Sequence, residues 1–172
     1  MAESDYRILV DGSGSMAESG KRYLVSDALA LFRALLDNGL LPSGSVRVFV
    51  LSSDIGPNAV SEADFDECCG NPERIPSFSG SGIDHRRLKV VLNGCPPGSR
   101  VLFLTDGFWD ATIGRALLEW TRTGGSDSLR ILRIGALPGA SVLSGSLGSR
   151  SFDIAELLPA VDLWRRQDGG PQ

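Results

Sequence analysis

The stretch ILVDGSGSM, residues 8–16, decides the fold of this chain. An apolar run at 8–10 ends at Asp11, and small hydroxyl and glycine residues then alternate for four positions before a helical pattern begins. The apolar residues of that pattern recur at helical spacing: Leu24, Ala28, Leu31 and Leu35. Gly39 follows, where a left-handed C-terminal cap belongs. The order predicted is a buried strand, a polar loop and an amphipathic helix.

Three further apolar runs have the length of strands: 46–51, 101–104 and 129–134. They are mostly continuous rather than alternating, as in strands that are covered on both faces. Helical patterns at 88–95, 113–120 and 154–161 separate or follow them. This alternation predicts a doubly wound, mainly parallel α/β sheet with helices on both faces, a three-layer Rossmann-like arrangement.

The remaining segments are less regular. Residues 52–81 mix turn residues with a short helical pattern at 62–68 and leave room for a short edge strand. Residues 135–152 are rich in Gly and Ser, and we expect a loop with one more short strand there. We expect a single domain over residues 1–167 and a frayed tail at 168–172.

The composition and charge of the chain disfavour several classes of function. The chain has 172 residues, 42% of them hydrophobic and 22% charged, as in one ordinary soluble domain. A net charge of -4 disfavours general affinity for nucleic acid or anionic lipid. No stretch approaches the length of a membrane span, and the N-terminus lacks the features of a secretory signal. The three cysteines form no disulfide framework or CxxC spacing, so we expect a reduced, cytoplasmic protein.

The polar loop does not fit a nucleotide-binding pattern. Gly20-Lys21 matches the end of a Walker phosphate loop, but Ser15 stands where its first glycine belongs. Arg22 then replaces the required hydroxyl residue. A dinucleotide-binding fingerprint would place Asp11 against a pyrophosphate, which its carboxylate would repel. We reject both interpretations.

The sequence also lacks residues that two classes of enzyme require. A serine hydrolase needs a GxSxG frame with a histidine, and the only histidine of the chain is His85. A haloacid-dehalogenase-like phosphotransferase needs a second acid two residues after Asp11, where the chain has Ser13. A magnesium-dependent phosphohydrolase that uses Asp11 and Asp106 remains an alternative. Its general base would have to be Asp110 or His85.

A metal site fits the loop better. Asp11, Ser13 and Ser15 alternate, so their oxygens can turn toward one point. Asp106, after a later strand, adds a second carboxylate at the carboxyl edge of the sheet, where ligands of such sheets bind. Oxygen ligands favour Mg²⁺, Mn²⁺ or Ca²⁺. Without a cation the two carboxylates would repel each other, so we expect removal of either to leave the metal-free fold intact or slightly more stable.

These residues resemble the metal-ion-dependent adhesion site (MIDAS) of the von Willebrand factor A domain family, in its small stand-alone intracellular bacterial form. The resemblance rests on DGSGS after a strand and on TDG, residues 105–107, after a later strand, and it covers most of the chain. It implies that the first loop holds the ion and that the later loop acts on it, commonly through water. The ligand set so implied is Asp11, Ser13, Ser15 and Asp106.

One family ligand is missing. The second loop of the family donates a threonine from a GGTD-like segment, and the matching segment here is SGSGIDHRRL, residues 79–88. Ile83 stands at the threonine position and has no oxygen to give. Ser81, Ser79 or water would have to replace it, so we expect weak metal binding. Asp84 is expected to cap the helix that follows rather than to bind the ion.

The resemblance implies a protein-binding module rather than an enzyme. Its ion would accept an Asp or Glu carboxylate of a partner protein, as in proteins that act beside AAA+ ATPases or in multi-protein bacterial stress and defence systems. We expect Trp109 and Phe108 to be exposed beside the metal and to contact the partner. The alternative for these aromatics is packing beneath the loop. A metal-free scaffold, with Ile83 marking a degenerate site, is a further alternative.

Overall fold

A computed structural model describes residues 4–53, 61–78, 81–107, 109–124, 128–135 and 147–167. The strands are β1 (Ser4–Asp11), β2 (Gly44–Leu51), β3 (Ser61–Ala63), β4 (Arg100–Thr105), β5 (Leu129–Arg133) and β6 (Ser151–Asp153). The helices are α1 (Lys21–Asp37), α2 (Phe65–Cys68), α3 (His85–Asn93), α4 (Ala111–Gly124) and α5 (Leu157–Gln167). Short 3-10 turns are η1 (Gly14–Ala17), η2 (Pro72–Arg74), η3 (Gly148–Arg150) and η4 (Ile154–Glu156).

The strands form one six-stranded sheet in the order β3-β2-β1-β4-β5-β6. All neighbouring pairs are parallel except β2 and β3, so the predicted mainly parallel sheet is confirmed. The chain moves outward from β1 to β3 and then outward in the other direction from β4 to β6. The reversal lies between the adjacent strands β1 and β4, which is where a ligand is expected in this fold.

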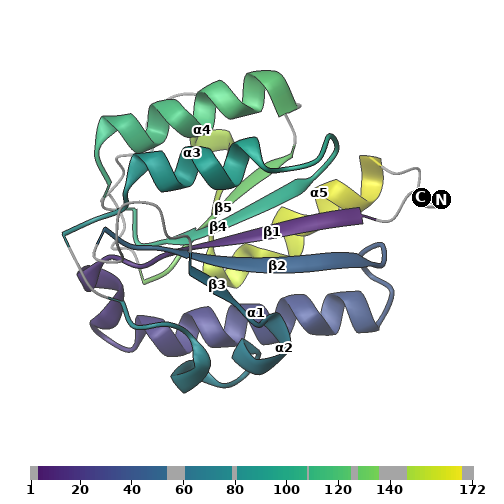
Figure 1. Cartoon of the computed structure of the whole chain (residues 1–172). Helices are drawn as coiled ribbons and strands as arrows, with labels where there is room; N and C mark the ends of the chain where they lie inside the picture. Colours follow the sequence, from purple (N-terminus) through teal and green to yellow (C-terminus); the bar gives the residue numbers. More distant parts are fainter. Residues whose placement is uncertain are drawn as a thin grey trace.

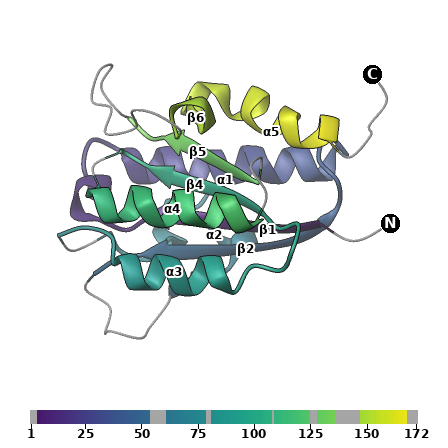
Figure 2. The same ribbon diagram turned by 90° about the horizontal axis from the view of Figure 1, so that it is seen from above.

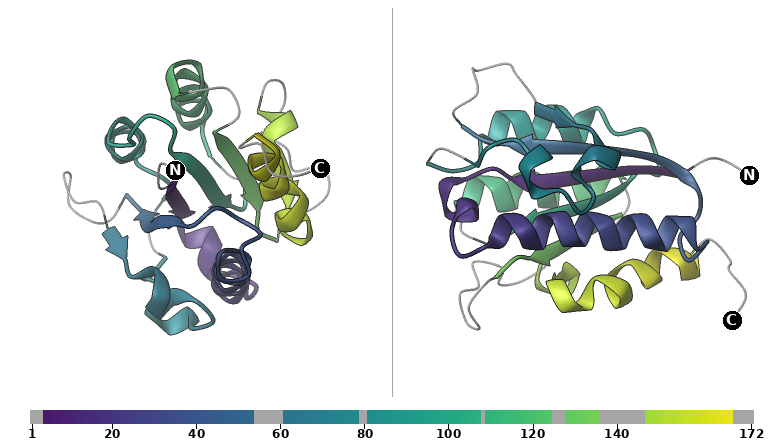
Figure 3. Two further views of the ribbon diagram at one scale, coloured as in Figure 1. Left: turned by 90° about the vertical axis from the view of Figure 1, so that its right-hand side faces the viewer. Right: turned by 90° about the horizontal axis from the view of Figure 1, so that it is seen from below.

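Helices cover both faces of the sheet (Figure 1). One buried cluster joins alternate residues of β1, such as Ile8 and Val10, to α1, α2 and α5. The other joins Leu9 of β1 to α3 and α4. Two further views show the same layers: α3 and α4 lie side by side in Figure 2, and α1 and α5 share the opposite face in Figure 3. The central strands are therefore buried on both faces, which explains their continuous apolar sequences.

The buried stripe of α1 differs from the one predicted. Leu31 is 45% exposed, so its place on the predicted stripe is wrong. The buried residues of the helix include Lys21, Val25, Ala28, Phe32 and Leu35, which repeat at helical spacing from the first residue of α1. Lys21 therefore lies on the face that packs against the sheet.

Most other local predictions are confirmed. Gly39 has a φ of 67°, as its place after α1 requires. The expected edge strand and short helix between residues 52 and 81 are β3 and α2, and the expected strand near residue 152 is β6. The tail at 168–172 lies outside the described residues. None of the helices in the described ranges is long and apolar enough to cross a membrane.

Candidate functional site

Asp11 is the last residue of β1 and is fully buried. Its Oδ1 accepts a hydrogen bond from the backbone N–H of Ser13 at 2.9 Å, within its own loop. Its Oδ2 accepts one from the hydroxyl of Thr105 at 2.8 Å, at the end of β4. One carboxylate thus joins the two strand ends at which the sheet order reverses.

Burial raises the pKa of the Asp11 carboxyl above its ordinary value of 3.8. The hydrogen bonds from Ser13 and Thr105 oppose this rise, and the charge of Asp106 adds to it. The raised pKa means that burial destabilises the ionised carboxylate by more than these hydrogen bonds stabilise it. A cation held near Asp11 would offset that cost.

The loop after Asp11 is packed closely against β2. The backbone N–H of Gly12 donates to the carbonyl of Leu51 at 2.9 Å. A Cβ atom at Gly12 would lie only 2.9 Å from a methyl carbon of Val50, so no side chain fits there. Beyond this contact, the hydroxyls of Ser13 and Ser15 lie 3.1 Å apart. The predicted convergence of the two serine hydroxyls is therefore present.

Asp106 follows β4 and is also fully buried, and a cation already lies against it. The ammonium of Lys21 is 2.9 Å from Oδ2 of Asp106. The same ammonium donates to the backbone carbonyl of Ser15 at 3.0 Å. Lys21 thus connects the first residue of α1 with both loops that were predicted to hold the metal.

Lys21 is the site residue that sequence reasoning missed, because it was weighed only as part of a Walker loop. Its signal was the helical repeat: four residues before Val25, Lys21 occupies the buried stripe of α1. Gly135, just after β5, completes its surroundings, since a Cβ there would lie 3.4 Å from the Lys21 stem. Thr105 belongs to the TDG motif, but the sequence assigns it no role in the site. Its hydroxyl donates to Asp11 and accepts a hydrogen bond from the N–H of Gly107 at 3.0 Å.

The second loop lies beside this constellation. The N–H of Ser53, after β2, donates to the carbonyl of Gly82 at 3.3 Å. Ile83 is partly buried and packs against the cluster beneath α3 and α4. Ser81 is exposed and, with Ile83, lines a pocket of about 520 Å³. Among the described residues that line this pocket, none is one of the four predicted metal ligands. Ser79 lies outside the described residues.

The aromatic prediction is corrected in part. Trp109 is only 9% exposed, so the expectation that it projects beside the metal is wrong. Its ring stacks on Phe103 of β4, with centroids 5.1 Å apart and an interplanar angle of 7°. The ring packs with the buried residues of α4, and Trp109 also lines the pocket that holds Ser81. Phe108 lies outside the described residues.

Asp110 is poorly suited to act as a general base. Asp110 accepts hydrogen bonds from the N–H groups of Thr112 and Ile113, and so caps α4. The hydrogen bonds from Thr112 lower the pKa of the Asp110 carboxyl, which makes it a weaker base. His85 is exposed at the start of α3. Asp84, which precedes it, caps α3 by accepting from the N–H of Arg86 at 2.8 Å, as predicted.

The donor set partly fits a hard cation. Two carboxylates and two hydroxyls, from Asp11, Asp106, Ser13 and Ser15, provide the oxygen chemistry that Mg²⁺ or Mn²⁺ prefers. Within the described ranges, however, no group of three or more His, Cys, Asp or Glu side chains comes together as a metal cluster. One of these carboxylates, Asp106, is already partly neutralised by the Lys21 ammonium.

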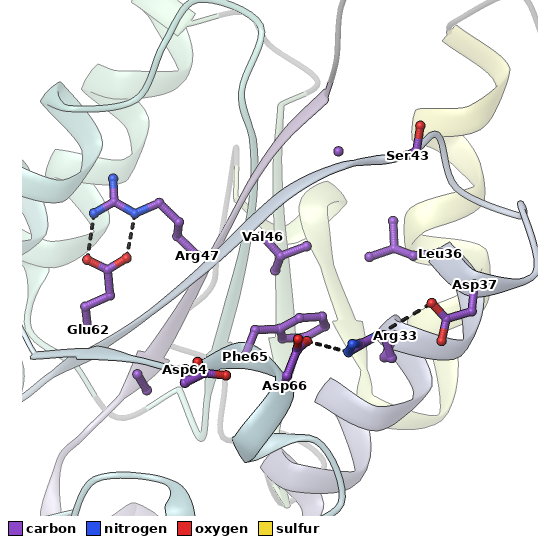
Figure 4. Close-up of a pocket in the computed structure, with 12 residues that line it drawn as sticks. Arg33, Leu36, Asp37, Ser43, Val46, Arg47, Glu62, Asp64, Phe65 and Asp66 are labelled. Carbon is purple, nitrogen blue, oxygen red and sulfur yellow. Dashed lines mark hydrogen bonds and ion pairs between the residues drawn. The ribbon is translucent and has the colours of Figure 1, made fainter.

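A second pocket, of about 550 Å³, lies at the other end of β2. Figure 4 shows that most of its charged side chains pair with one another: Arg47 forms two hydrogen bonds of 2.6 Å with Glu62, and Arg33 lies between Asp37 and Asp66. Gly44, on its rim, pairs with Ser4 at the start of β1, so this pocket is remote from Asp11. Because these ion pairs are partly exposed, each contributes little to stability, and we assign this pocket no functional role.

No protein-family model and no curated protein sequence matches the chain. Solved structures do match it. Proximal thread matrix protein 1 from the mussel byssus is 14% identical with a TM-score of 0.58, over 94% of this chain and 46% of that one. The pilus adhesin SpaC from Lactobacillus rhamnosus GG is 14% identical with a TM-score of 0.56, over 97% of this chain and 30% of that one.

A further structure of the mussel protein has zinc in its MIDAS motif. It is 15% identical to this chain with a TM-score of 0.57, and the match covers 94% of this chain and 47% of that one. The chain therefore spans less than half the length of each of these proteins. At such identities the likeness is one of fold. It agrees with the α/β arrangement that the resemblance to A domains predicted.

Proposed function

We propose that this chain is a protein-binding module of the A-domain type. Its binding site is the edge of the sheet where β1 and β4 end, and its ligand is an Asp or Glu carboxylate of a partner protein. The carrying observation is the position of Asp11, buried at the point of strand reversal and hydrogen-bonded to both loops. The likeness in fold to a structure with an occupied MIDAS motif supports this proposal.

The metal is part of the proposal. Asp11, Ser13, Ser15 and Asp106 would hold a hard divalent cation, Mg²⁺ or Mn²⁺ before Ca²⁺, with an affinity on the order of 0.1 to 1 mM. The bound cation would supply the positive charge that a partner carboxylate recognises. The side chain of Ile83 has no oxygen that could bind the cation, so Ser81 or water would have to complete the ligand set.

The pocket beside the site would take the neighbouring part of the partner. Trp109 and Ile83 give it apolar walls, and Ser81 and Asp110 give it polar ones. The partner class inferred from the family resemblance is an AAA+ ATPase or another member of a multi-protein bacterial system. Catalysis is not part of this proposal, because Asp110 is poorly suited to act as a base.

A metal-free binding module is the second candidate. The Lys21–Asp106 ion pair favours it, since a buried ammonium already provides a positive charge at the site. Under this alternative, chelator would not affect partner binding. The two candidates therefore differ in one simple measurement.

A displayed peptide library, selected on the protein in magnesium and eluted first with chelator and then with acid, makes this distinction. We expect enriched peptides to share an Asp or Glu, and to lose binding when it becomes Asn or Gln. Asp106→Asn should also abolish binding, whereas Lys89→Met, on the exposed face of α3, should not. Acid-dependent peptides that stay bound in chelator would establish the metal-free alternative. Peptides without a shared acid would contradict both candidates.

A further inference from the structure

Lys21 is one of only two lysines in the chain, against fifteen arginines. Its side chain is 11% exposed, and its ammonium contacts both Asp106 and the backbone carbonyl of Ser15. The other lysine, Lys89, pairs with Glu119 at 3.2 Å on the surface. A lysine places a compact charge on a flexible stem, whereas an arginine would place a broad planar group there.

We infer that Lys21 is a tethered cation that competes with a divalent metal ion for Asp106, and so sets the metal affinity of the site. This inference rests on the proposed metal site. In the metal-free protein the ammonium neutralises Asp106. When a divalent ion binds, Lys21 has to leave that carboxylate.

The physical reason is the low polarity around the pair. Asp106 is fully buried, so a second positive charge near it is poorly screened from the Lys21 ammonium. The free energy needed to break the Lys21–Asp106 ion pair is therefore subtracted from the free energy of metal binding. The competition acts together with the missing oxygen at Ile83, and both lower the affinity.

The position of Lys21 in α1 is compatible with movement away from Asp106. It is the first residue of α1, so its stem starts at the end of the helix. Ser19 and Gly20, directly before it, both have positive φ angles and form the turn into the helix. We expect rotation of the stem to release the ammonium from Asp106 without moving the body of α1.

Manganese alone is a suitable probe, because free Mn²⁺ can be counted by its paramagnetic resonance signal during a titration. We expect Lys21→Met and Lys21→Gln to bind Mn²⁺ at least tenfold more tightly than the wild type. Lys21→Arg, which keeps the charge, should not show this gain. Lys89→Met removes the other lysine and should bind as the wild type does.

Stability gives a second measurement in case Lys21→Met is poorly folded in chelator. Its melting temperature should rise more with saturating Mn²⁺ than that of the wild type, because metal replaces the lost ammonium. Lys21→Gln keeps a hydrogen-bond donor for Asp106 and provides a milder variant.

The outcomes separate this inference from the function on which it rests. Equal or weaker Mn²⁺ binding by both neutral variants, with measurable binding by the wild type, would overturn the role of Lys21 and leave the metal site standing. Absence of binding in every variant would overturn the metal site and the inference with it. A tenfold gain that disappears when Asp106→Asn is added would support both.

Discussion

Lys21 and Asp106, 85 residues apart in sequence, form a buried ion pair with 2.9 Å between Nζ and Oδ2. The expectation from sequence was that Asp11 and Asp106 repel each other when no cation lies between them. The structure places a cation of the protein itself against one of the two. Repulsion between the carboxylates still adds to the raised pKa of Asp11, but burial is its larger cause.

We now expect Asp106→Asn to destabilise the metal-free protein, contrary to the expectation from sequence. The change leaves the buried Lys21 ammonium without its carboxylate, and loss of one partner of a buried pair costs about 3 kcal/mol. Denaturant unfolding in chelator measures this loss. Adding Lys21→Met should recover part of it, because the double variant holds no unpaired buried charge.

Asp11→Asn is the matched control for that experiment. Burial already disfavours the ionised form of Asp11, so a neutral amide should cost the metal-free fold less than Asp106→Asn does. Its Oδ1 can still accept from the N–H of Ser13. Equal losses from the two variants would show that the Lys21 ion pair contributes little to stability.

Ile83→Thr should tighten metal binding several-fold, because it supplies an oxygen at the family position without adding charge. Ile83 also packs against buried residues, so the variant should lose about 1 kcal/mol of unfolding free energy. Ile83→Val keeps the branched shape without the hydroxyl and controls for that loss. Unchanged affinity in the threonine variant would mean that Ser81 already fills the position or that the segment is aligned wrongly.

Nucleotides and phosphoesters should not be hydrolysed above background. Asp110 is held as a helix cap, and its lowered pKa makes it a weak base for the activation of water at Asp11. Release of phosphate from a nucleotide and a simple phosphoester, in magnesium, tests this expectation. Magnesium-dependent turnover that is lost in Asp11→Ala would establish the phosphohydrolase alternative.

The stability of the fold should depend on pH through Asp5, at the opposite end of β1. Burial raises the pKa of this carboxyl, but hydrogen bonds from Arg7 and Ser99, with the Arg7 charge, outweigh it and lower the pKa below 3.8. A lowered pKa stabilises the fold fully above 3.8, and this contribution is lost as the pH falls through the folded value. Asp5→Asn should therefore destabilise the protein at pH 7 and have less effect in strong acid. An equal effect at both pH values would mean that Asp5→Asn destabilises the fold through altered packing rather than through loss of the charge.

The fold could be predicted from sequence because its signals are local. Continuous apolar strands such as Arg100–Thr105, with helical patterns between them, specify a parallel sheet. The polar residues follow the strands, as Asp11 does, which places them at the carboxyl edge of that sheet. Hydroxyl convergence at Ser13 and Ser15 follows from alternation within one loop. These features need no knowledge of distant contacts.

The unpredicted parts depend on contacts across the sequence. Nothing within the helix that Lys21 begins shows that its ammonium reaches Asp106, since that pairing requires the start of α1 to lie beside the loop after β4. The burial of Trp109 likewise depends on Phe103, six residues earlier, lying on the face under α4. The sequence placed Trp109 at the surface and gave Lys21 no role in the site, and the three-dimensional arrangement differs in both cases.

A crystal of the wild-type protein soaked in manganese, examined by anomalous scattering, tests the central claim most directly. The account predicts a manganese peak among the oxygens of Asp11, Ser13, Ser15 and Asp106, with the Lys21 ammonium moved away from Asp106. The concentration of manganese should exceed the dissociation constant found in solution. A map without a peak there, with Lys21 still bound to Asp106, would contradict the metal site.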